Sequence, residues 1–199
     1  MNLPAVPPGI RLLGITGAPG VGKTTVATAL RLPVVPMDGF HYADVELVRR
    51  GLRDRKGAPE TFDAEGYAAL LARVRAGEPD VVAPMFERAL EQPIAGAIAV
   101  PATGTVVTEG NYLLLDEPRW RVVREQLDVV WHLHVDDGVR RERLVARHVE
   151  FGKTPAEARA WVARVDDANA ALVEVAAARA DVVVELSEAR PRTPPASRR

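Results

Sequence analysis

The glycine-rich segment Gly17 to Thr24, Gly-Ala-Pro-Gly-Val-Gly-Lys-Thr, limits the possible folds more than any other part of the chain. Two glycines five positions apart, followed by Lys and Thr, form the pattern of a loop that holds phosphate groups with main-chain N–H groups. The apolar run 10–16 precedes this loop, and residues 21–30 follow it with a helical pattern. The segment therefore predicts a strand, a tight loop and a helix, with a polyphosphate bound where the helix begins.

The spacing also assigns a ligand to each side chain at the end of the loop. We expect Lys23 to reach the β- and γ-phosphates and to act in catalysis, and the Thr24 hydroxyl to ligate magnesium. We therefore predict ATP and Mg²⁺ as the cofactors. The loop residues predicted to bind the nucleotide are Gly17, Ala18, Pro19, Gly20, Val21, Gly22, Lys23, Thr24 and Thr25.

Length and composition are typical of one compact domain. The chain has 199 residues, of which 47% are apolar and 27% charged. We expect a nucleotide-binding domain over residues 10–186, preceded by an N-terminal extension over 1–9. The tail 187–199 contains three prolines and four arginines but no apolar run, so we expect it to be disordered. Its first residues, 187–190, are a candidate for contacts with adenine.

Charge and cysteine content exclude several classes of function. A formal net charge of -1 gives no field that would attract nucleic acid or an anionic membrane. The chain has no cysteine, which excludes disulfides, thiolate zinc sites and cysteine nucleophiles and fits the cytoplasm. The N-terminal run contains three prolines and lacks a basic leader, and no apolar stretch reaches about 20 residues. We therefore expect no signal peptide, no membrane span and a small molecule as partner, with the oligomeric state open, a homodimer included.

Short apolar runs alternate with helical patterns along the chain. The runs at 34–37, 81–85, 105–108, 129–135 and 182–186 are almost continuously apolar, as buried parallel strands are. Helices are predicted over 67–74, behind Asp63 as the N-cap, and over 139–149 and 156–178. The last helix is expected to turn Trp161, Val162, Val165 and Leu172 inward. The alternation predicts an α/β fold with a layered sheet. Because the chain also has the phosphate loop, we expect a three-layer sandwich of the P-loop NTPase type with a central parallel sheet, and with a helical lid of the kind that the resemblance given below implies.

Two carboxylates follow predicted strands, at the edge of an open α/β sheet where ligands bind. Asp38 comes directly after the run 34–37. It can accept the proton of an attacking hydroxyl, which is the one acid–base step in phosphoryl transfer to an alcohol. Glu109 follows the run 105–108 and can orient a magnesium-bound water or contact the acceptor. Asp136 is a rival metal ligand after the run 129–135, although a role as N-cap of the next helix explains it adequately.

Arg140, Arg143 and Arg147 recur three and four positions apart, which places three guanidinium groups on one face of a helix. Such a face is either a solvated basic stripe or a lid that closes over phosphates and neutralises charge on the transferred group. We expect at least one of the three to act as a lid, with the choice among them open, and we name Arg143 and Arg147 as candidates for the nucleotide and Arg143 also for catalysis.

Several segments together resemble the superfamily of uridine kinase, phosphoribulokinase and type I pantothenate kinase, over roughly residues 10–186. The segment Arg55 to Asp63, Arg-Lys-Gly-Ala-Pro-Glu-Thr-Phe-Asp, looks most like pantothenate kinases, and Pro84 to Arg88, Pro-Met-Phe-Glu-Arg, looks more like uridine kinases. The overall pattern is similar to a bacterial branch named nucleoside or fructose-transport kinases. The other segments that carry the resemblance are the phosphate loop, Asp38-Gly39-Phe40-His41-Tyr42 and Glu109-Gly110.

The resemblance implies a role for most of these side chains. Asp38 would be the general base, Lys23 and Thr24 would bind ATP and magnesium, Glu109 would lie near the metal, and an arginine-bearing lid would follow the fourth strand of the sheet. Two alternatives remain, namely that His41 satisfies a loop backbone and that Lys56 is a solvated charge. The residues implied to surround the acceptor are Asp38, His41, Tyr42, Lys56, Glu87, Arg88 and Glu109.

The expected activity is transfer of the γ-phosphoryl group of ATP to a hydroxyl of a nucleoside, a pantothenate-like or a sugar-like metabolite. Two other functions stay open: a nucleotide-dependent switch without a small acceptor, and a nucleoside monophosphate kinase. The switch predicts a purine-reading Asn-Lys-x-Asp motif, which the sequence lacks. A monophosphate acceptor needs cationic clamps more than a carboxylate base, so Asp38 favours a hydroxyl.

Overall fold

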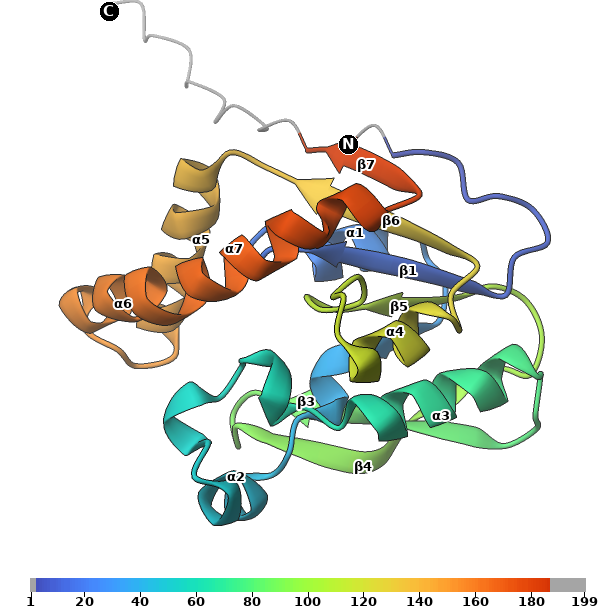
Figure 1. The fold of residues 1–199 in the computed structure, drawn as a ribbon, viewed down its shortest axis with the longest axis horizontal. Helices are drawn as coiled ribbons and strands as arrows, with labels where there is room; N and C mark the ends of the chain where they lie inside the picture. Colours follow the sequence, from blue (N-terminus) through green and yellow to red (C-terminus); the bar gives the residue numbers. More distant parts are fainter. Residues whose placement is uncertain (1–2, 187–199) are drawn as a thin grey trace, which may run out of the picture.

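Five parallel strands form a sheet at the centre of the molecule (Figure 1). The computed structural model describes residues 3–186, and the strands lie in the order β2-β5-β1-β6-β7. This arrangement confirms the predicted central parallel sheet. Its strands correspond to the apolar runs predicted at 10–16, 34–37, 105–108, 129–135 and 182–186. The strands are β1 (Leu12–Gly17), β2 (Val34–Pro36), β5 (Val106–Glu109), β6 (Val129–His134) and β7 (Val182–Glu185).

Helices cover both faces of the sheet, so the fold has the three layers that the sequence predicts. Every residue of β1 is buried, because both faces of this central strand carry apolar neighbours. On one face, Leu13 and Ile15 pack in a cluster with Val26 of α1 (Lys23–Ala29). On the other face, Leu12 belongs to a larger cluster that includes side chains of α3 (Ala64–Arg75), α4 (Pro118–Arg124) and α7 (Asp167–Ala176).

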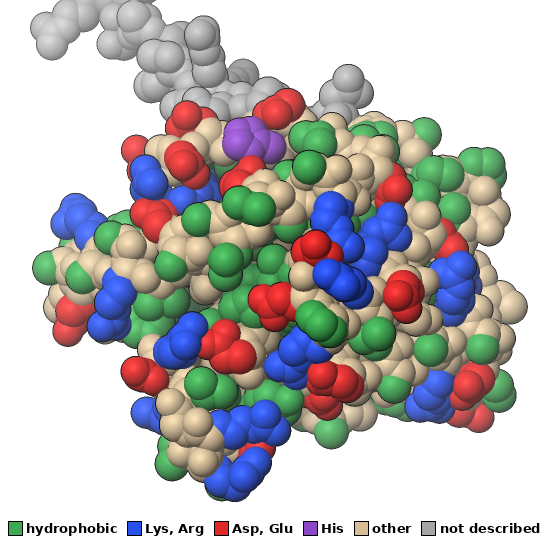
Figure 2. Space-filling model, in the orientation of Figure 1, with side chains coloured by type: hydrophobic (Ala, Val, Ile, Leu, Met, Phe, Trp, Pro, Cys, Tyr) green, Lys and Arg blue, Asp and Glu red, His purple; other side chains and the backbone are tan. Residues whose placement is uncertain are grey.

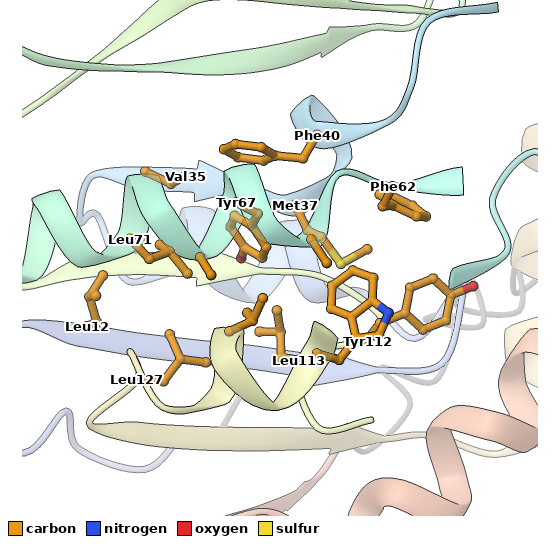
Figure 3. Packing of buried hydrophobic residues seen from close by; sticks show 14 of the residues in the cluster. Leu12, Val35, Met37, Phe40, Phe62, Tyr67, Leu71, Tyr112, Leu113 and Leu127 are labelled. Atoms are coloured by element: carbon orange, nitrogen blue, oxygen red, sulfur yellow. The ribbon is translucent and has the colours of Figure 1, made fainter. Parts of the chain in front are cut away.

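The larger cluster also holds the short turn that carries Asp38. This turn, η1 (Met37–Phe40), is a 3₁₀ helix that follows β2. Figure 3 shows Phe40 beside Tyr67 of α3, and their ring centroids lie 4.7 Å apart. Met37 is fully buried. The backbone around Asp38 is therefore anchored on both sides by core side chains.

The predicted strand 81–85 exists, but its assignment to the parallel sheet is wrong. β3 (Val81–Glu87) pairs antiparallel with β4 (Gln92–Val100) in a separate two-stranded sheet. The burial of β3 explains the difference, because Val81 and Ala83 are buried while Val82 between them is exposed. Alternation of this kind is typical of an antiparallel sheet with one solvated face, whereas a parallel strand is buried on both faces.

The arm beside the sheet consists of α5 (Asp137–Glu150) and α6 (Pro155–Trp161), and α7 leads back from it over the sheet (Figure 1). The arm follows β6, which is the fourth strand of the sheet in chain order, so the predicted helical lid is present. The predicted helix over 156–178 is present, because helical backbone runs from 155 to 179 without a break, but it is not α-helical throughout. A π turn, η4 (Val162–Asp166), separates α6 from α7. Because a π turn changes the helical phase, Leu172 lies outward with 46% of its surface exposed.

Aspartate caps begin two of the predicted helices. The carboxylate of Asp63 accepts a hydrogen bond of 3.0 Å from the Gly66 N–H at the start of α3. The carboxylate of Asp136 accepts one of 2.8 Å from the Gly138 N–H at the start of α5. The N-cap explanation of Asp136 is therefore confirmed.

Several elements were not expected from the sequence, namely β4, η1, α2, α4 and three further 3₁₀ turns. Within residues 3–186, no helix has both the length and the apolar character needed to cross a bilayer. In the N-terminal extension, Leu3 and Val6 pack against the smaller cluster. The tail 187–199, with the candidate adenine contact at 187–190, lies outside the described residues. The unexpected elements not yet bounded are α2 (Asp44–Arg50), η2 (Arg53–Arg55), η3 (Pro59–Thr61) and η5 (Ala177–Arg179).

Candidate active site

The phosphate loop connects β1 to α1, as its sequence predicts. Gly20 shows why a glycine is needed in it, because its φ of 84° is in the left-handed region and α5 packs directly against it. A Cβ atom at this position would lie 2.7 Å from Cγ of Leu144 and 2.9 Å from the carbonyl oxygen of Arg140. The loop is therefore held in shape by the lid helix α5 as well as by β1.

Lys23 lies across the inside of the loop. Its ammonium group donates hydrogen bonds to the carbonyl oxygens of Gly17, at 2.9 Å, and Ala18, at 3.1 Å. Burial lowers the pKa of Lys23 to about 8, and the carboxylates of Glu109 and Asp38 partly oppose this effect. A phosphate bound in the loop would therefore replace these two neutral carbonyl acceptors of the Lys23 ammonium group with a charged acceptor.

Thr24 and Glu109 are in direct contact. The Thr24 hydroxyl, in the first turn of α1, donates a hydrogen bond of 2.9 Å to Oε1 of Glu109 at the end of β5. Glu109 is only 8% exposed. Burial raises the pKa of the Glu109 carboxyl, nearby Asp38 raises it further, and Lys23 and Thr24 lower it. Two oxygen ligands suited to Mg²⁺ therefore lie side by side next to the phosphate loop.

Asp38 reaches the same place from the third neighbouring strand. The phosphate loop follows β1, Asp38 follows β2, and Glu109 is the last residue of β5. These three strands are neighbours in the sheet, in the order β2-β5-β1. Because the carboxyl ends of parallel strands meet at one edge, the three groups converge.

Close packing and hydrogen bonds fix the backbone around Asp38. Gly39 lies against β3, and a Cβ atom on it would come within 2.5 Å of the Pro84 carbonyl oxygen. The imidazole Nδ1 of His41 lies 3.0 Å from the carbonyl oxygen of Asp38. The Asp38 carboxylate itself remains 39% exposed and has the guanidinium of Arg88 at 3.9 Å.

These groups line a cavity of about 390 Å³, which we call the phosphate pocket. Its volume is within the range of small-ligand sites. Figure 2 shows acidic and basic side chains mixed over the face that it draws, and the lining of the pocket is likewise mixed, with four cations and three carboxylates. The lining residues are Pro19, Gly20, Gly22, Lys23, Thr24, Thr25, Asp38, Arg88, Glu109, Asn111, Arg143, Leu144, Arg147, Glu150 and Phe151.

The three predicted lid arginines do not share one environment. Arg143 donates a hydrogen bond of 3.2 Å to the carbonyl oxygen of Val21 in the phosphate loop, and Arg147 lines the same pocket. Burial and the neighbouring Arg88 lower the pKa of Arg147. Arg140 instead is buried and forms ion pairs at 2.9 Å with Asp137 and 2.6 Å with Asp167.

Four residues implied to surround the acceptor do not line the phosphate pocket. The His41 ring packs on Phe62 with 3.8 Å between ring centroids. Its Nδ1 contacts the Asp38 carbonyl oxygen, which agrees with the alternative that His41 satisfies a loop backbone. Lys56 is not a solvated charge, because its ammonium pairs with Asp44 at 2.7 Å and also bonds the Glu91 carbonyl. The other two are Tyr42, whose ring lies 4.1 Å beneath the Arg50 guanidinium, and Glu87, whose carboxylate caps the Ala89 N–H at 3.0 Å.

Four lining residues were missed by the sequence analysis. Asn111 follows Glu109 by two positions, and its carbonyl oxygen accepts a hydrogen bond of 3.0 Å from the Thr16 hydroxyl. Its place after a predicted strand was a usable signal. Leu144, Glu150 and Phe151 are on or directly after α5, and their direction depends on how that helix packs. No cluster of three or more His, Cys, Asp or Glu side chains that could hold a metal occurs within the described part of the chain.

Curated proteins with similar sequences include kinases. No family model matches the chain. It is 35% identical over 181 residues to the "Uncharacterized protein YggC" of Escherichia coli, covering 85% of this chain and 75% of that protein. It is 33% identical to the "Putative uridine kinase C227.14" of Schizosaccharomyces pombe, covering 87% and 82%. A pantothenate kinase of Limosilactobacillus reuteri is 33% identical over 63% of this chain and 44% of its own length.

A solved structure of a kinase is also similar to this chain. The "putative fructose transport system kinase" from Silicibacter sp. TM1040 superposes with a TM-score of 0.79 and 40% identity, covering 92% of this chain and 93% of that one. The superposition shows that the two chains share one fold over most of their length. The chain therefore belongs to the uridine kinase and pantothenate kinase superfamily of P-loop kinases, which are phosphotransferases, and within it to the branch of YggC and the fructose transport system kinase.

Proposed function

We propose that the chain transfers the γ-phosphoryl group of ATP to a hydroxyl group of a small metabolite. The observation that carries this proposal is that Asp38 lies in the same pocket as Lys23, Thr24 and Glu109. A phosphate cradle alone would serve any nucleotide hydrolase. A carboxylate that is 39% exposed beside the cradle supplies what a hydroxyl acceptor needs in addition.

The phosphate side of the pocket fits ATP with magnesium. Thr24 and Glu109 offer two adjacent oxygen ligands, and Mg²⁺ commonly takes one or two protein ligands together with phosphate oxygens and waters. Bound there, the ion would neutralise charge on the β- and γ-phosphates. Lys23 would leave the two loop carbonyls for the phosphates, a short movement within the loop it already spans.

The acceptor side of the pocket is assigned to Asp38 and its neighbours. Asp38 would accept the proton of the acceptor hydroxyl as the phosphorus–oxygen bond forms. Arg88, which approaches Asp38 and also lines the pocket, would contact the acceptor or the transferred group. His41 would orient Asp38 through its carbonyl group, and Tyr42, Lys56 and Glu87 would shape the acceptor side through the contacts described above.

The lid contributes positive charge from above the loop. Arg143 already bonds the Val21 carbonyl, and Arg147 faces the same cavity. In the closed complex these guanidinium groups would stabilise charge that develops on the transferred group and exclude water from it.

Nucleosides, pantothenate-like molecules and sugar-like molecules are the acceptor classes we propose, on the strength of the relatives' names. The test is ATP consumption by the purified chain with Mg²⁺, measured against a panel of nucleosides, pantothenate, sugars and nucleoside monophosphates. We expect one hydroxyl compound to raise the rate far above the basal hydrolysis. Equal slow turnover with every compound would identify a switch, and stimulation by a monophosphate alone would identify a monophosphate kinase.

A further inference from the structure

A second cavity lies on the lid, outside the phosphate pocket. It has a volume of about 560 Å³ and is formed by the turn after α5 together with α6 and η4. It shares no lining residue with the phosphate pocket, and no residue of the acceptor side contributes to it. We call it the Trp161 pocket, and its lining residues are Gly152, Lys153, Glu157, Ala160, Trp161 and Arg164.

Two cations converge on the aromatic ring of this pocket. The ammonium nitrogen of Lys153 lies 4.9 Å from the centroid of the Trp161 ring, and the guanidinium carbon of Arg164 lies 5.5 Å from it. Neither cation forms an ion pair with a carboxylate of residues 3–186. Two positive charges therefore face one small space, and the carboxylate of Glu157 is the negative charge that shares the lining with them.

Glu157 is the one acidic residue among those that line the pocket, but its carboxylate is already engaged. It accepts hydrogen bonds of 2.9 Å from the Thr154 N–H and 2.7 Å from the Thr154 hydroxyl, as half of a capping box at the start of α6. Both bonds end on Oε2, and together with the charge of Lys153 they lower the pKa of Glu157, so this one carboxylate offsets part of the positive charge of Lys153 and Arg164.

The backbone that carries Trp161 is unusual. The π turn η4 begins at the next residue, and its Asp166 bonds His148 of α5 through Nε2 at 2.8 Å. This pair ties the wide turn to the neighbouring helix. Single π turns within helices are rare and are found frequently at functional sites. The π turn is thus a second observation, independent of the charges, that marks this part of the lid.

We propose that the Trp161 pocket binds a small aromatic anion, a flat ring that carries a phosphate or carboxylate group. The ring of such a ligand would lie against the indole of Trp161, and its anionic group would pair with Arg164 and Lys153. Arginine suits this role because its planar group both stacks and binds carboxylate or phosphate through two hydrogen bonds. The proposal does not depend on the proposed kinase activity, since the two cavities share no residue.

Tryptophan fluorescence of the intact chain tests the proposal directly. The other two tryptophans, Trp120 and Trp131, are fully buried, so Trp161 is the one that a ligand can touch. Phenyl phosphate is the probe, titrated with ADP and Mg²⁺ present at saturation so that the phosphate loop is filled. We expect a saturable change in emission that Trp161→Phe removes. No saturable change up to about 10 mM, the weak limit for small-ligand binding, would overturn the proposal.

Variants of the two cations supply the second test. Lys153→Ala combined with Arg164→Ala should weaken phenyl phosphate binding at least tenfold by calorimetry. Arg159→Ala is the control, because this arginine is exposed on α6, the helix that carries Trp161, and does not line the pocket. Equal weakening by the control, or unchanged affinity in the double variant, would contradict the assignment.

Simpler compounds separate the parts of the ligand. Inorganic phosphate and phenol should each bind at least tenfold more weakly than phenyl phosphate, because each lacks one half of the interaction. Equal affinity for inorganic phosphate would refute an aromatic site. Adenosine monophosphate and benzoate, titrated in the same way, distinguish a nucleotide from an aromatic carboxylate as the source of the anion, and whichever binds more tightly identifies it.

Discussion

The Thr24 hydroxyl donates a hydrogen bond of 2.9 Å to Oε1 of Glu109, although the two residues are 85 positions apart in the chain. This contact joins the first turn of α1 to the end of β5. It brings the hydroxyl that ends the phosphate loop and a buried carboxylate to the same point, where each would offer an oxygen to the proposed Mg²⁺. The pair thus defines where the metal side of the proposed active site meets the acceptor side.

Glu109→Gln should therefore separate metal binding from nucleotide binding. The amide keeps the size of the side chain and an oxygen for Thr24, but it loses the negative charge that favours Mg²⁺. We expect the concentration of Mg²⁺ needed for half-maximal activity to rise by about 10- to 100-fold. Binding of ADP without metal should change little. Glu150→Gln is the control, because it removes a carboxylate from the exposed rim of the same pocket. An unchanged Mg²⁺ requirement in Glu109→Gln would remove this residue from the metal site.

Asp38→Asn should lower turnover while leaving nucleotide affinity almost unchanged. The substitution removes the proton acceptor but leaves the phosphate loop intact, so kcat should fall by about 10²- to 10⁴-fold. The dissociation constant for ATP, measured by calorimetry, should stay within about twofold of the original value, well under 1 kcal/mol. Basal ATP hydrolysis without acceptor serves as the internal reference. Transfer at the original rate would show that another group accepts the proton.

The nucleotide side of the site was predictable from the sequence because its residues are consecutive. A glycine-rich loop determines its own backbone shape, so the positions of Lys23 and Thr24 follow from the pattern. Asp38 and Glu109 were predictable for a related reason, since both come at the carboxyl end of an apolar run and parallel strands bring those ends together.

The acceptor side was less predictable because its side-chain directions depend on tertiary packing. Lys56 illustrates this point, because the ion pair with Asp44 turns it towards α2 rather than towards the pocket. The strand 81–85 was assigned to the wrong sheet for a similar reason. Its composition is apolar throughout, and the exposure of Val82 becomes evident only once β4 is paired beside it.

Nucleotide binding should depend on pH through Lys23. Its pKa is lowered from 10.5 to about 8, chiefly by burial, so the ammonium form predominates below pH 8 in the free protein. If the phosphates need that form, affinity for ATP should be nearly constant at low pH. It should fall as the pH rises through 8, by about tenfold per unit well above that value. Isothermal titration from about pH 6 to about pH 10, a range that spans the Lys23 pKa, measures this dependence. Lys23→Met should bind ATP more weakly, and its affinity should no longer fall as the pH rises through 8.

The stability of the nucleotide-free protein should respond to the same group with the opposite sign. Between pH 8 and 10.5 the folded protein has released the Lys23 proton while the unfolded chain still holds it. Because the unfolded state then binds more protons, the free energy of unfolding contributed by Lys23 rises with pH over this window. Denaturant titrations of the original chain and of Lys23→Met measure the difference. An identical pH dependence in both would show that the Lys23 pKa is not depressed.

Arg140 and Arg143 should give opposite results although they are three positions apart on α5. Arg140 is buried and holds Asp137 and Asp167 together, so Arg140→Ala should reduce the free energy of unfolding by about 1–3 kcal/mol. Arg143 is exposed and contacts only the Val21 carbonyl among the described hydrogen-bond partners, so Arg143→Ala should change stability by less than about 0.5 kcal/mol. Its loss should instead lower kcat by about 10- to 1,000-fold, because a positive charge near the transferred group is removed. Thermal unfolding and turnover measured on both variants distinguish the roles. Loss of stability in Arg143→Ala with normal turnover would assign this arginine to the fold and leave the lid contribution to Arg147.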